Sequence, residues 1–258
     1  MINKETFNAI FEKAKGYKYS SMSYIDFEDC ESCEILHEGD DFILMQDKSK
    51  SPYMLHYAAN DFGASLEAIA KLTSKLRIHF VPKEHKQSLV EMGFKEWGEY
   101  ADFWNVDLVE TASHFSDLDQ AQHLNLDECE IASTVTKSCM LQSRGFEGCP
   151  PEFYKEWLND GNHIITARQG SEIVGVCSIS IYNEGTTLWI KEIATDPKYQ
   201  GLGFGKKMLE QAIAFGVKNG AVKGFLMADI LNKNAIGLYN KYGFYAKNDD
   251  SELQMIKE

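Results

Sequence analysis

The sequence predicts an α/β fold in which helices flank a mixed sheet, and it predicts that this arrangement occurs twice. In the second half of the chain, apolar runs of strand length alternate with segments whose apolar residues recur at helical spacing. The first half ends in the same order of elements, with Gly93-Phe94 matching Gly243-Phe244. A chain of 258 residues is long enough for two small domains.

The C-terminal half can be predicted element by element. Pro150-Pro151-Glu152 opens a short helix through Leu158, because proline is favoured in a first helical turn. A second helix is predicted after Gly205 from apolar residues at helical spacing, and Asn219-Gly220 provides its stop. The other predicted elements are strands over 162–168, 173–182, 188–194 and 225–230, a helix over 233–241 and a last strand after Phe244.

In the first half, strands are predicted over 54–58, 76–81 and 100–108, with helical patterns over 66–72 and from Lys83. These elements echo those of the second half in order and type. We place the boundary in the polar stretch that follows, which gives domains 1–115 and 116–258.

Charge and hydropathy exclude several classes of partner. The formal net charge is −13, and residues 1–125 carry 12 basic against 22 acidic side chains. Such a chain repels phosphate backbones, so no nucleic-acid partner is expected, whereas an acidic field attracts amines and other cations. The longest nearly apolar run, 173–182, is half of the roughly 20 residues that cross a bilayer. No membrane span and no signal peptide are predicted, which makes a cytoplasmic location the expectation.

Of the six cysteines, only Cys30 and Cys33 form a close pair. A zinc site would need two more ligands at metal spacing, and neither a second pair nor a His-x-x-x-His follows. In a reducing compartment the cysteines are small, mostly inert side chains. The sequence therefore predicts no metal.

A glycine-rich turn, Gln200-Gly201-Leu202-Gly203-Phe204-Gly205, lies between a predicted strand and a predicted helix. The dinucleotide pattern would require glycine at 206 or 208, and the Walker pattern would require it at 200, so both fail. Backbone N–H groups in such a turn point at whatever lies on the helix N-terminus, which suits a phosphate or pyrophosphate. Nearby positive charge comes from Lys198, Lys206 and Lys207. A tight turn without a ligand is the alternative.

A second group of residues follows on the next predicted helix. Asn232 and Tyr239 are seven residues apart, so they share one face if the helix covers both. A buried tyrosine can also be a core aromatic, and the spacing alone leaves both readings open.

Together, the segment from Glu192 to Gly205, then Asn232, then Ala235 to Phe244 resembles the GNAT superfamily of acetyl-CoA-dependent N-acyltransferases, over about residues 125–258. The resemblance implies the mixed-sheet acyl-CoA N-acyltransferase fold, of α/β (α+β) class, in two tandem GNAT-like domains. It implies acetyl-CoA as cosubstrate and Tyr239 as general acid. The positions implied to hold the CoA moiety are Ile193, Ala194, Thr195, Gln200, Gly201, Leu202, Gly203, Phe204, Gly205, Lys206 and Asn232.

The chain departs from its relatives at the general base. Some members carry a glutamate at the position of Met227 and others at that of Trp189, and this chain has it at neither. Glu192 is the first candidate for the base and Asp229 the second, with a water relay to either. The alternative for Glu192 is a solvated carboxylate at the end of a strand.

The first half resembles the same family with its functional side chains missing. Aligning the Gly-Phe pairs places Leu89 opposite Tyr239 and Pro82 opposite Asn232. The turn Asn60-Asp61-Phe62-Gly63-Ala64 has one glycine and an acid that repels pyrophosphate. We expect a degenerate copy without a CoA site, which either covers a sheet edge or forms one wall of an acceptor cleft.

The sequence thus predicts an N-acetyltransferase that acts on a primary amine of a small molecule or peptide. The acidic first half motivates the hypothesis of a cationic acceptor. The alternative is an acyl-CoA-binding sensor or scaffold without turnover. By analogy with the GNAT superfamily, we expect residues 144–150 to border the acceptor cleft. The identity of the acceptor, the acyl length and the oligomeric state are left open.

Overall fold

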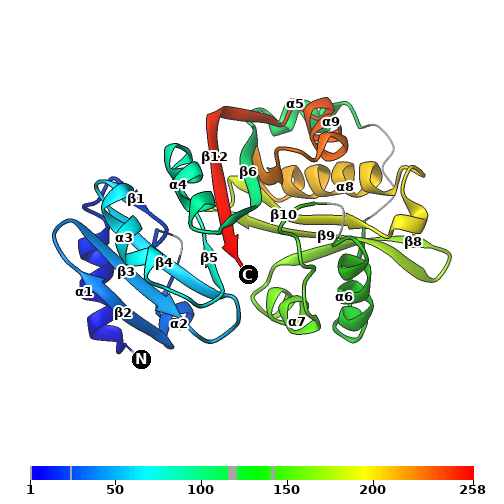
Figure 1. The fold of residues 1–258 in the computed structure, drawn as a ribbon. Helices are drawn as coiled ribbons and strands as arrows, with labels where there is room; N and C mark the ends of the chain where they lie inside the picture. Colours follow the sequence, from blue (N-terminus) through cyan, green and yellow to red (C-terminus); the bar gives the residue numbers. More distant parts are fainter. Residues whose placement is uncertain (1, 24, 116–120, 141–142) are drawn as a thin grey trace. The chain divides into compact units, whose positions relative to one another are not determined.

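The computed structural model of the protein describes residues 2–23, 25–115, 121–140 and 143–258, with side chains at all of these except 247–250 (Figure 1). The chain divides into two compact units. The N-terminal unit comprises Met1–Glu99 and Glu252–Glu258, and the C-terminal unit comprises Tyr100–Ser251.

The N-terminal unit is built on strands in the order β2-β3-β4-β5-β12, and β1 pairs with Ala58 and Ala59 at the end of β4. Strands β4 and β5 run parallel, and the other neighbours run antiparallel. Its strands are β1 Tyr19–Ser20, β2 Cys33–Glu38, β3 Phe42–Asp47, β4 Tyr53–Ala59 and β5 Leu76–Ile78, and its α-helices are α1 Lys4–Ala14, α2 Phe27–Cys30, α3 Leu66–Ala70 and α4 Lys86–Glu91.

Strands β3 and β4 alternate between two apolar layers, because successive side chains of a strand point to opposite faces. Ile43, Met45 and Ala58 are buried in one cluster with residues of α1. Leu44 and Tyr57 are buried in the other cluster, on the opposite face. Both faces of this sheet are therefore covered, which explains why these strands read as nearly continuous apolar runs.

The sheet strands of the C-terminal unit follow the order β6-β11-β10-β9-β8-β7. Among the described residues of these six strands, β10 and β11 are the only parallel neighbours. The strands are β6 Lys95–Asn105, β7 Gln122–His123, β8 His163–Gln169, β9 Glu172–Tyr182, β10 Thr187–Thr195 and β11 Lys223–Asp229, and the chain ends in β12 Tyr245–Lys257. The helices are α5 Leu108–Ser113, α6 Cys129–Ser138, α7 Pro151–Asn159, α8 Phe204–Lys218 and α9 Lys233–Lys241.

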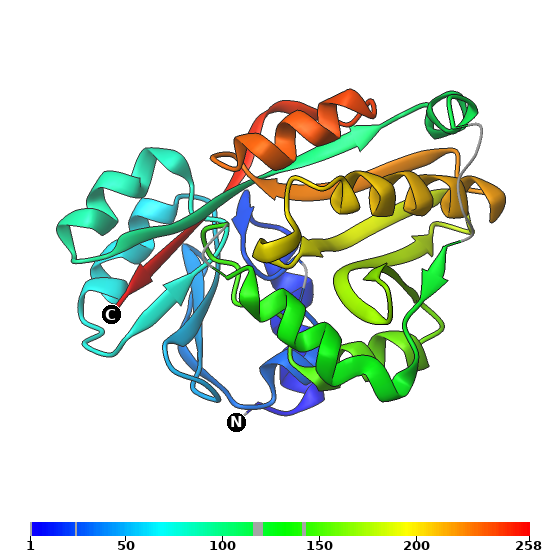
Figure 2. The same cartoon turned by 90° about the vertical axis from the view of Figure 1, so that its right-hand side faces the viewer.

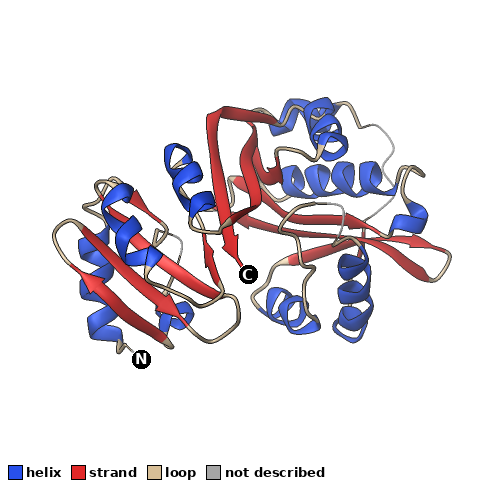
Figure 3. Cartoon of the chain, in the orientation of Figure 1, coloured by secondary structure: helices blue, strands red, loops and turns tan. Residues whose placement is uncertain are grey.

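Helices cover both faces of the C-terminal sheet. Helix α8 packs on one face, with α9 and α5 beside it, and α6 and α7 pack on the other (Figures 1 and 3). Figure 2 shows the same two layers from the side, with the gold helix α8 and the green helix α6 on opposite sides of the yellow strands. No helix in the described part of the chain is long and apolar enough to cross a membrane.

The mixed sheet with flanking helices is confirmed, and most predicted elements of the C-terminal half lie where the sequence places them. The helix predicted over 233–241 is α9, and the strand over 188–194 lies within β10. The strand predicted over 100–108 is wrong at its end. Asp107 caps α5 by accepting a hydrogen bond from the Glu110 N–H at 3.2 Å, so the chain turns into a helix there.

The expected boundary between residues 115 and 116 falls at the segment 116–120, outside the described residues. The compact units divide the chain elsewhere. From Tyr100 to Asn105, β6 pairs with β11 of the C-terminal unit. The last residues of β12 pair with β5 of the N-terminal unit, with Met255 opposite Ile78. Each unit is therefore completed by a strand from the opposite half of the sequence, which motif spacing does not reveal.

Candidate active site

Strands β10 and β11 are parallel neighbours that pair over only part of their length. The register runs from Thr187 opposite Lys223 to Ile190 opposite Leu226. At the same level the pairing of β10 with β9 shifts by one residue, between Ile190 and Glu192. Such a bulge bends the strand and interrupts its ladder. The last part of β10 therefore offers backbone groups along the edge that faces β11.

The turn after β10 depends on two glycines in left-handed backbone conformations. Gly201 has φ of 78° and Gly203 has φ of 88°, a region in which other residues are strained. Gly203 is the N-cap of α8, and its first turn has neither a capping side chain nor an acidic residue. A Cβ added at either glycine would meet nothing within 4 Å, so the space before the helix is open. Uncapped N–H groups and the positive end of the helix dipole suit a phosphate or pyrophosphate.

The turn is tied to the end of β10. The Gln200 side-chain amide donates a hydrogen bond to the Thr195 carbonyl at 3.0 Å. A Cβ on Gly205 would lie 3.5 Å from the Thr195 hydroxyl oxygen, which places the helix start against the strand end. The Lys206 ammonium lies 3.6 Å from the Glu210 carboxylate and remains largely exposed. The structure therefore gathers the strand residues 193–195 and the turn residues 200–206 at one place.

Helix α9 supplies the other two predicted residues. The Asn232 side chain caps the helix by accepting a hydrogen bond from the Ala235 N–H at 3.2 Å. Tyr239 lies two turns later and is buried, with its ring centroid 6.4 Å from that of Phe103. Burial, with a smaller effect of Cys177, raises the pKa of Tyr239 above its ordinary value. The phenol is therefore protonated at neutral pH and can donate a proton.

Glu192 is not the exposed strand-end carboxylate that the alternative reading requires. Its side chain is 8% exposed, and one oxygen, Oε2, accepts a hydrogen bond from the Tyr154 hydroxyl at 2.9 Å. The other oxygen, Oε1, is buried without a hydrogen-bond partner among the described residues, and so is the Ser178 hydroxyl opposite Glu192 on β9. Burial raises the pKa of Glu192 against the lowering effect of the Tyr154 bond. A carboxyl with a raised pKa and a free oxygen has the properties of a general base.

Asp229, the second candidate for the base, is held in an ion pair. The Arg144 guanidinium donates to Asp229 at 2.7 and 3.1 Å, and the backbone N–H groups of Arg144 and Leu231 donate to it at 3.1 and 3.0 Å. Burial alone would raise the pKa of Asp229, but these donors outweigh it and hold the pKa below its ordinary value. This carboxylate is fully engaged and poorly suited to accept a proton.

The two catalytic candidates belong to opposite faces of the sheet. Tyr239 is part of the cluster that packs α8 and α9 against the strands. Glu192 is bonded to Tyr154 of α7, on the face that α6 and α7 cover. The unpaired stretch between β10 and β11 lies between these two faces, so a ligand held there can meet one residue from each.

Two residues that shape this site make contacts with the candidate bases that the sequence did not predict. Tyr154 lies on the helix predicted through Leu158; it is buried, and its hydroxyl donates a hydrogen bond to Glu192. Arg144 was placed at the border of an acceptor cleft, and its partner Asp229 lies far away in the sequence. The sequence offers one signal for the Tyr154 contact: a tyrosine on the apolar face of an amphipathic helix is expected to be buried, and a buried hydroxyl needs a hydrogen-bond partner.

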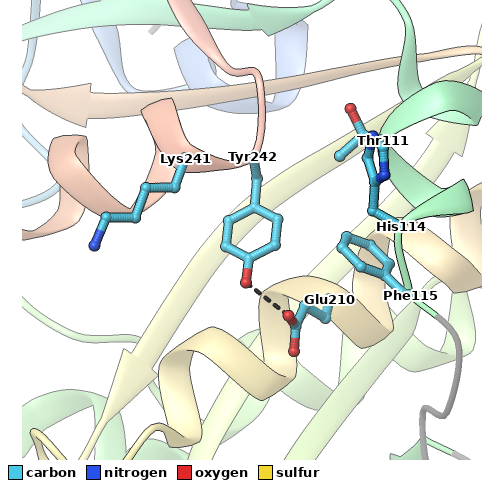
Figure 4. A pocket seen from close by; sticks show the side chains of 6 residues that line it. All are labelled: Thr111, His114, Phe115, Glu210, Lys241 and Tyr242. Carbon is cyan, nitrogen blue, oxygen red and sulfur yellow. Dashed lines mark hydrogen bonds between the residues drawn. The ribbon is translucent and has the colours of Figure 1, made fainter.

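A pocket of about 360 Å³ lies elsewhere in the C-terminal unit, between α5, α8 and α9 (Figure 4). The Tyr242 hydroxyl donates to Glu210 at 2.6 Å inside it. The pocket is lined by Thr111, His114, Phe115, Glu210, Lys241 and Tyr242. None of the site residues predicted from the sequence lines this pocket.

The C-terminal half of the chain is similar to known acetyltransferases. Residues 132–244 match the model of the acetyltransferase (GNAT) family. The N-alpha-acetyltransferase RimI of Mycobacterium tuberculosis is 32% identical over 97 residues, which are 37% of this chain and 60% of that protein. The chain thus spans less than two thirds of the length of this relative.

Solved structures resemble the chain over most of its length. A conserved protein of unknown function from Staphylococcus epidermidis superposes with a TM-score of 0.58 at 16% identity, covering 92% of this chain and 99% of that one. A tandem GNAT protein from the clavulanic acid biosynthesis pathway superposes with a TM-score of 0.55 at 9% identity, covering 85% and 80%. At these identities the likeness is one of fold.

Proposed function

Residues 132–244 belong to the GNAT family of acetyltransferases, and we propose that the protein transfers an acetyl group from acetyl-CoA to a primary amine. The observation that carries the proposal is the partial pairing of β10 with β11 next to an uncapped helix N-terminus. A thioester lying along the free edge of β10 would have its pyrophosphate at the start of α8.

The residues of the turn fit the CoA moiety of such a cosubstrate. Gly201 and Gly203 leave open space in front of the helix, and the first turn carries no carboxylate that would repel an anion. Backbone groups of Ile193 and Ala194 would pair with the pantetheine arm. Asn232 already caps α9, so a contact with CoA would use its remaining amide hydrogens.

Three groups of this chain would serve the reaction in distinct ways. Bound acetyl-CoA would supply an activated acyl group. Glu192, whose pKa is raised by burial, would accept the proton of the attacking amine, directly or through a water at its free oxygen. A backbone N–H at the bulge of β10 would donate to the carbonyl oxygen as it gains charge, and Tyr239 would donate its phenol proton to the leaving sulfur.

The acceptor is proposed by class alone. It is a primary amine on a small molecule or peptide, and the acidic excess of residues 1–125 favours a cationic one. We also propose that the protein is located in the cytoplasm.

The N-terminal half is proposed to be a degenerate copy of the same fold without a CoA site. Its counterpart of the phosphate turn is closed by the Asp61 carboxylate, which accepts a hydrogen bond from the Gly63 N–H at 2.8 Å. A negative charge there disfavours a pyrophosphate. The residue aligned with Tyr239, Leu89, is fully buried in the apolar core.

The test is release of free CoA from acetyl-CoA, followed with a thiol reagent across a panel of primary amines. We expect release with at least one amine, and a large loss of kcat in Tyr239→Phe with unchanged acetyl-CoA binding. Tyr242→Phe, which removes a neighbouring phenol bonded to Glu210, is the matched control and should keep its activity. Binding of acetyl-CoA without release for any amine would instead favour the sensor or scaffold, an alternative that the family match does not favour.

A further inference from the structure

Three metal-ligating side chains meet in the N-terminal unit. Cys30 is the last residue of α2, Cys33 is the first residue of β2, and His56 lies in β4. The two sulfurs and a ring nitrogen of His56 all lie within 4.8 Å of one another. Both cysteines are fully buried and His56 is 8% exposed. This cluster belongs to no part of the proposed acyl-transfer site.

The sheet register explains why the three residues meet. Met45 lies opposite His56 in the β3–β4 pair, and Cys33 lies opposite Asp47 in the β2–β3 pair. Because opposite residues of an antiparallel pair share a face, and because Met45 and Asp47 are two apart, all four side chains are on one face. That face packs against α1 and α2, and the end of α2 brings Cys30 to it.

The donor atoms are available for a ligand. Both thiols are free of disulfides. The ring nitrogens of His56 make no hydrogen bond to another described residue, although a buried imidazole ordinarily has one. Asp47 adds negative charge at the edge of the cluster, where Ser32 and Ser49 hold its carboxylate through hydrogen bonds of 2.6 to 2.9 Å.

We propose that Cys30, Cys33 and His56 bind one thiophilic divalent cation of the Zn²⁺ class. Two thiolates and one neutral imidazole are soft and borderline ligands that suit this ion. A tetrahedral zinc with Zn–S bonds of about 2.3 Å places two sulfurs about 3.8 Å apart, so small side-chain rotations close the site. The two thiolates balance the charge of the cation, which makes the complex neutral and compatible with burial.

With three protein ligands, the proposed site is an open metal site. Three protein ligands leave a fourth position for water or a small exogenous ligand. Binding would cross-link the turn between α2 and β2 to the middle of the sheet. The cation would therefore stabilise the N-terminal unit, because it binds the folded chain and has no preformed site in the unfolded one.

Close spacing in the sequence reveals only part of this cluster. The Cys30-x-x-Cys33 pair was recognised, and the third ligand comes from a strand two positions across the sheet. A histidine at an inward-facing position of a predicted strand was the available signal.

The test uses the full-length reduced protein and titration with Co²⁺, whose thiolate complexes absorb in the near ultraviolet, followed by displacement with Zn²⁺. We expect one Co²⁺ per chain with a sulfur-to-cobalt band, its loss on Zn²⁺ addition and a higher Tm with Zn²⁺. His56→Gln should weaken Zn²⁺ binding by roughly 100-fold or more, since even outer-shell partners cost 10- to 100-fold. The double variant Cys30→Ser/Cys33→Ser should lose the band.

Cys149→Ser is the matched control, because Cys149 is the most exposed of the six cysteines and the first expected to bind metal adventitiously. It should leave stoichiometry and band unchanged. The proposal is overturned if reduced wild-type protein gives no sulfur-to-cobalt band, a result that needs no variant to fold. It is equally overturned if the band persists in the double variant or disappears in Cys149→Ser.

Discussion

Tyr154→Phe removes one oxygen atom from the network around Glu192 and keeps the aromatic ring. The Tyr154 side chain is completely buried among residues of α6 and α7, so the ring continues to fill its place. Its hydroxyl lies 2.9 Å from Glu192 Oε2 and 3.0 Å from the Thr136 hydroxyl. The other oxygen of Glu192 has no partner among the described residues, so the substitution leaves the carboxyl group without its hydrogen bond from Tyr154.

The expected loss depends on the charge of Glu192. A hydrogen bond to a neutral group contributes about 1 kcal/mol to stability, and one to a charged group contributes about 2 kcal/mol. Losing the bond therefore disfavours the charged form more than the neutral form, which raises the pKa of Glu192 further. Because burial already raises this pKa, the stability contributed by Glu192 is present below its unfolded pKa and is lost as pH rises through the folded pKa.

The free energy of unfolding should therefore fall by about 1 kcal/mol in Tyr154→Phe at acidic pH and by about 2 kcal/mol above the folded pKa of Glu192. Urea denaturation followed by circular dichroism at several pH values measures both losses. Tyr242→Phe, which removes a phenol bond to the partly exposed Glu210, is the control and should show a smaller loss. A loss in Tyr154→Phe that does not change with pH would refute the reasoning.

The remaining predictions concern the turn before α8 and the ion pair of Arg144 with Asp229. Gly203→Ala should lower the free energy of unfolding by about 1 kcal/mol, because φ is 88° there. Gly237→Ala, on the exposed side of α9 where a Cβ meets nothing, should raise the free energy of unfolding by up to about 1 kcal/mol, and thermal unfolding measures both changes. Arg144→Met should cost about 3 kcal/mol at neutral pH, because it removes the guanidinium counter-ion of the buried Asp229 and leaves only the two backbone N–H donors. Because the folded pKa of Asp229 is lowered, that cost is fully present above its unfolded pKa and should shrink as pH falls toward and through the folded pKa, which urea denaturation at two pH values would detect.

The sequence predicts the C-terminal half well where local signals and packing agree. Asn232 as a cap and apolar spacing define α9, and the glycine turn marks the start of α8. The N-terminal half is predicted less completely. The hairpin β2–β3 was not predicted, because β3 is buried on both faces and lacks the alternation that identifies a strand. Helix α1 was not predicted either, although Asn3 caps it and Phe7, Ile10 and Ala14 recur at helical spacing.

The candidate site also has a part that could be predicted from the sequence and a part that could not. Its turn and strand are local in sequence and could be predicted, but the roles of Tyr154 and Arg144 depend on partners contributed by distant strands. The compact units are also non-local, since β12 returns to the sheet of the first half. Contacts of this kind follow from sheet order, which single-sequence patterns do not specify.

Calorimetric titration with acetyl-CoA tests the central claim most directly, using Gly203→Asn and Gly203→Asp beside the wild-type protein. Both side chains tolerate a positive φ and have the same shape, so they differ at the start of α8 in charge alone. The account predicts one acetyl-CoA per wild-type chain and roughly tenfold or weaker binding in Gly203→Asp than in Gly203→Asn. Equal affinities of the two variants, two molecules per chain, or no binding would contradict it.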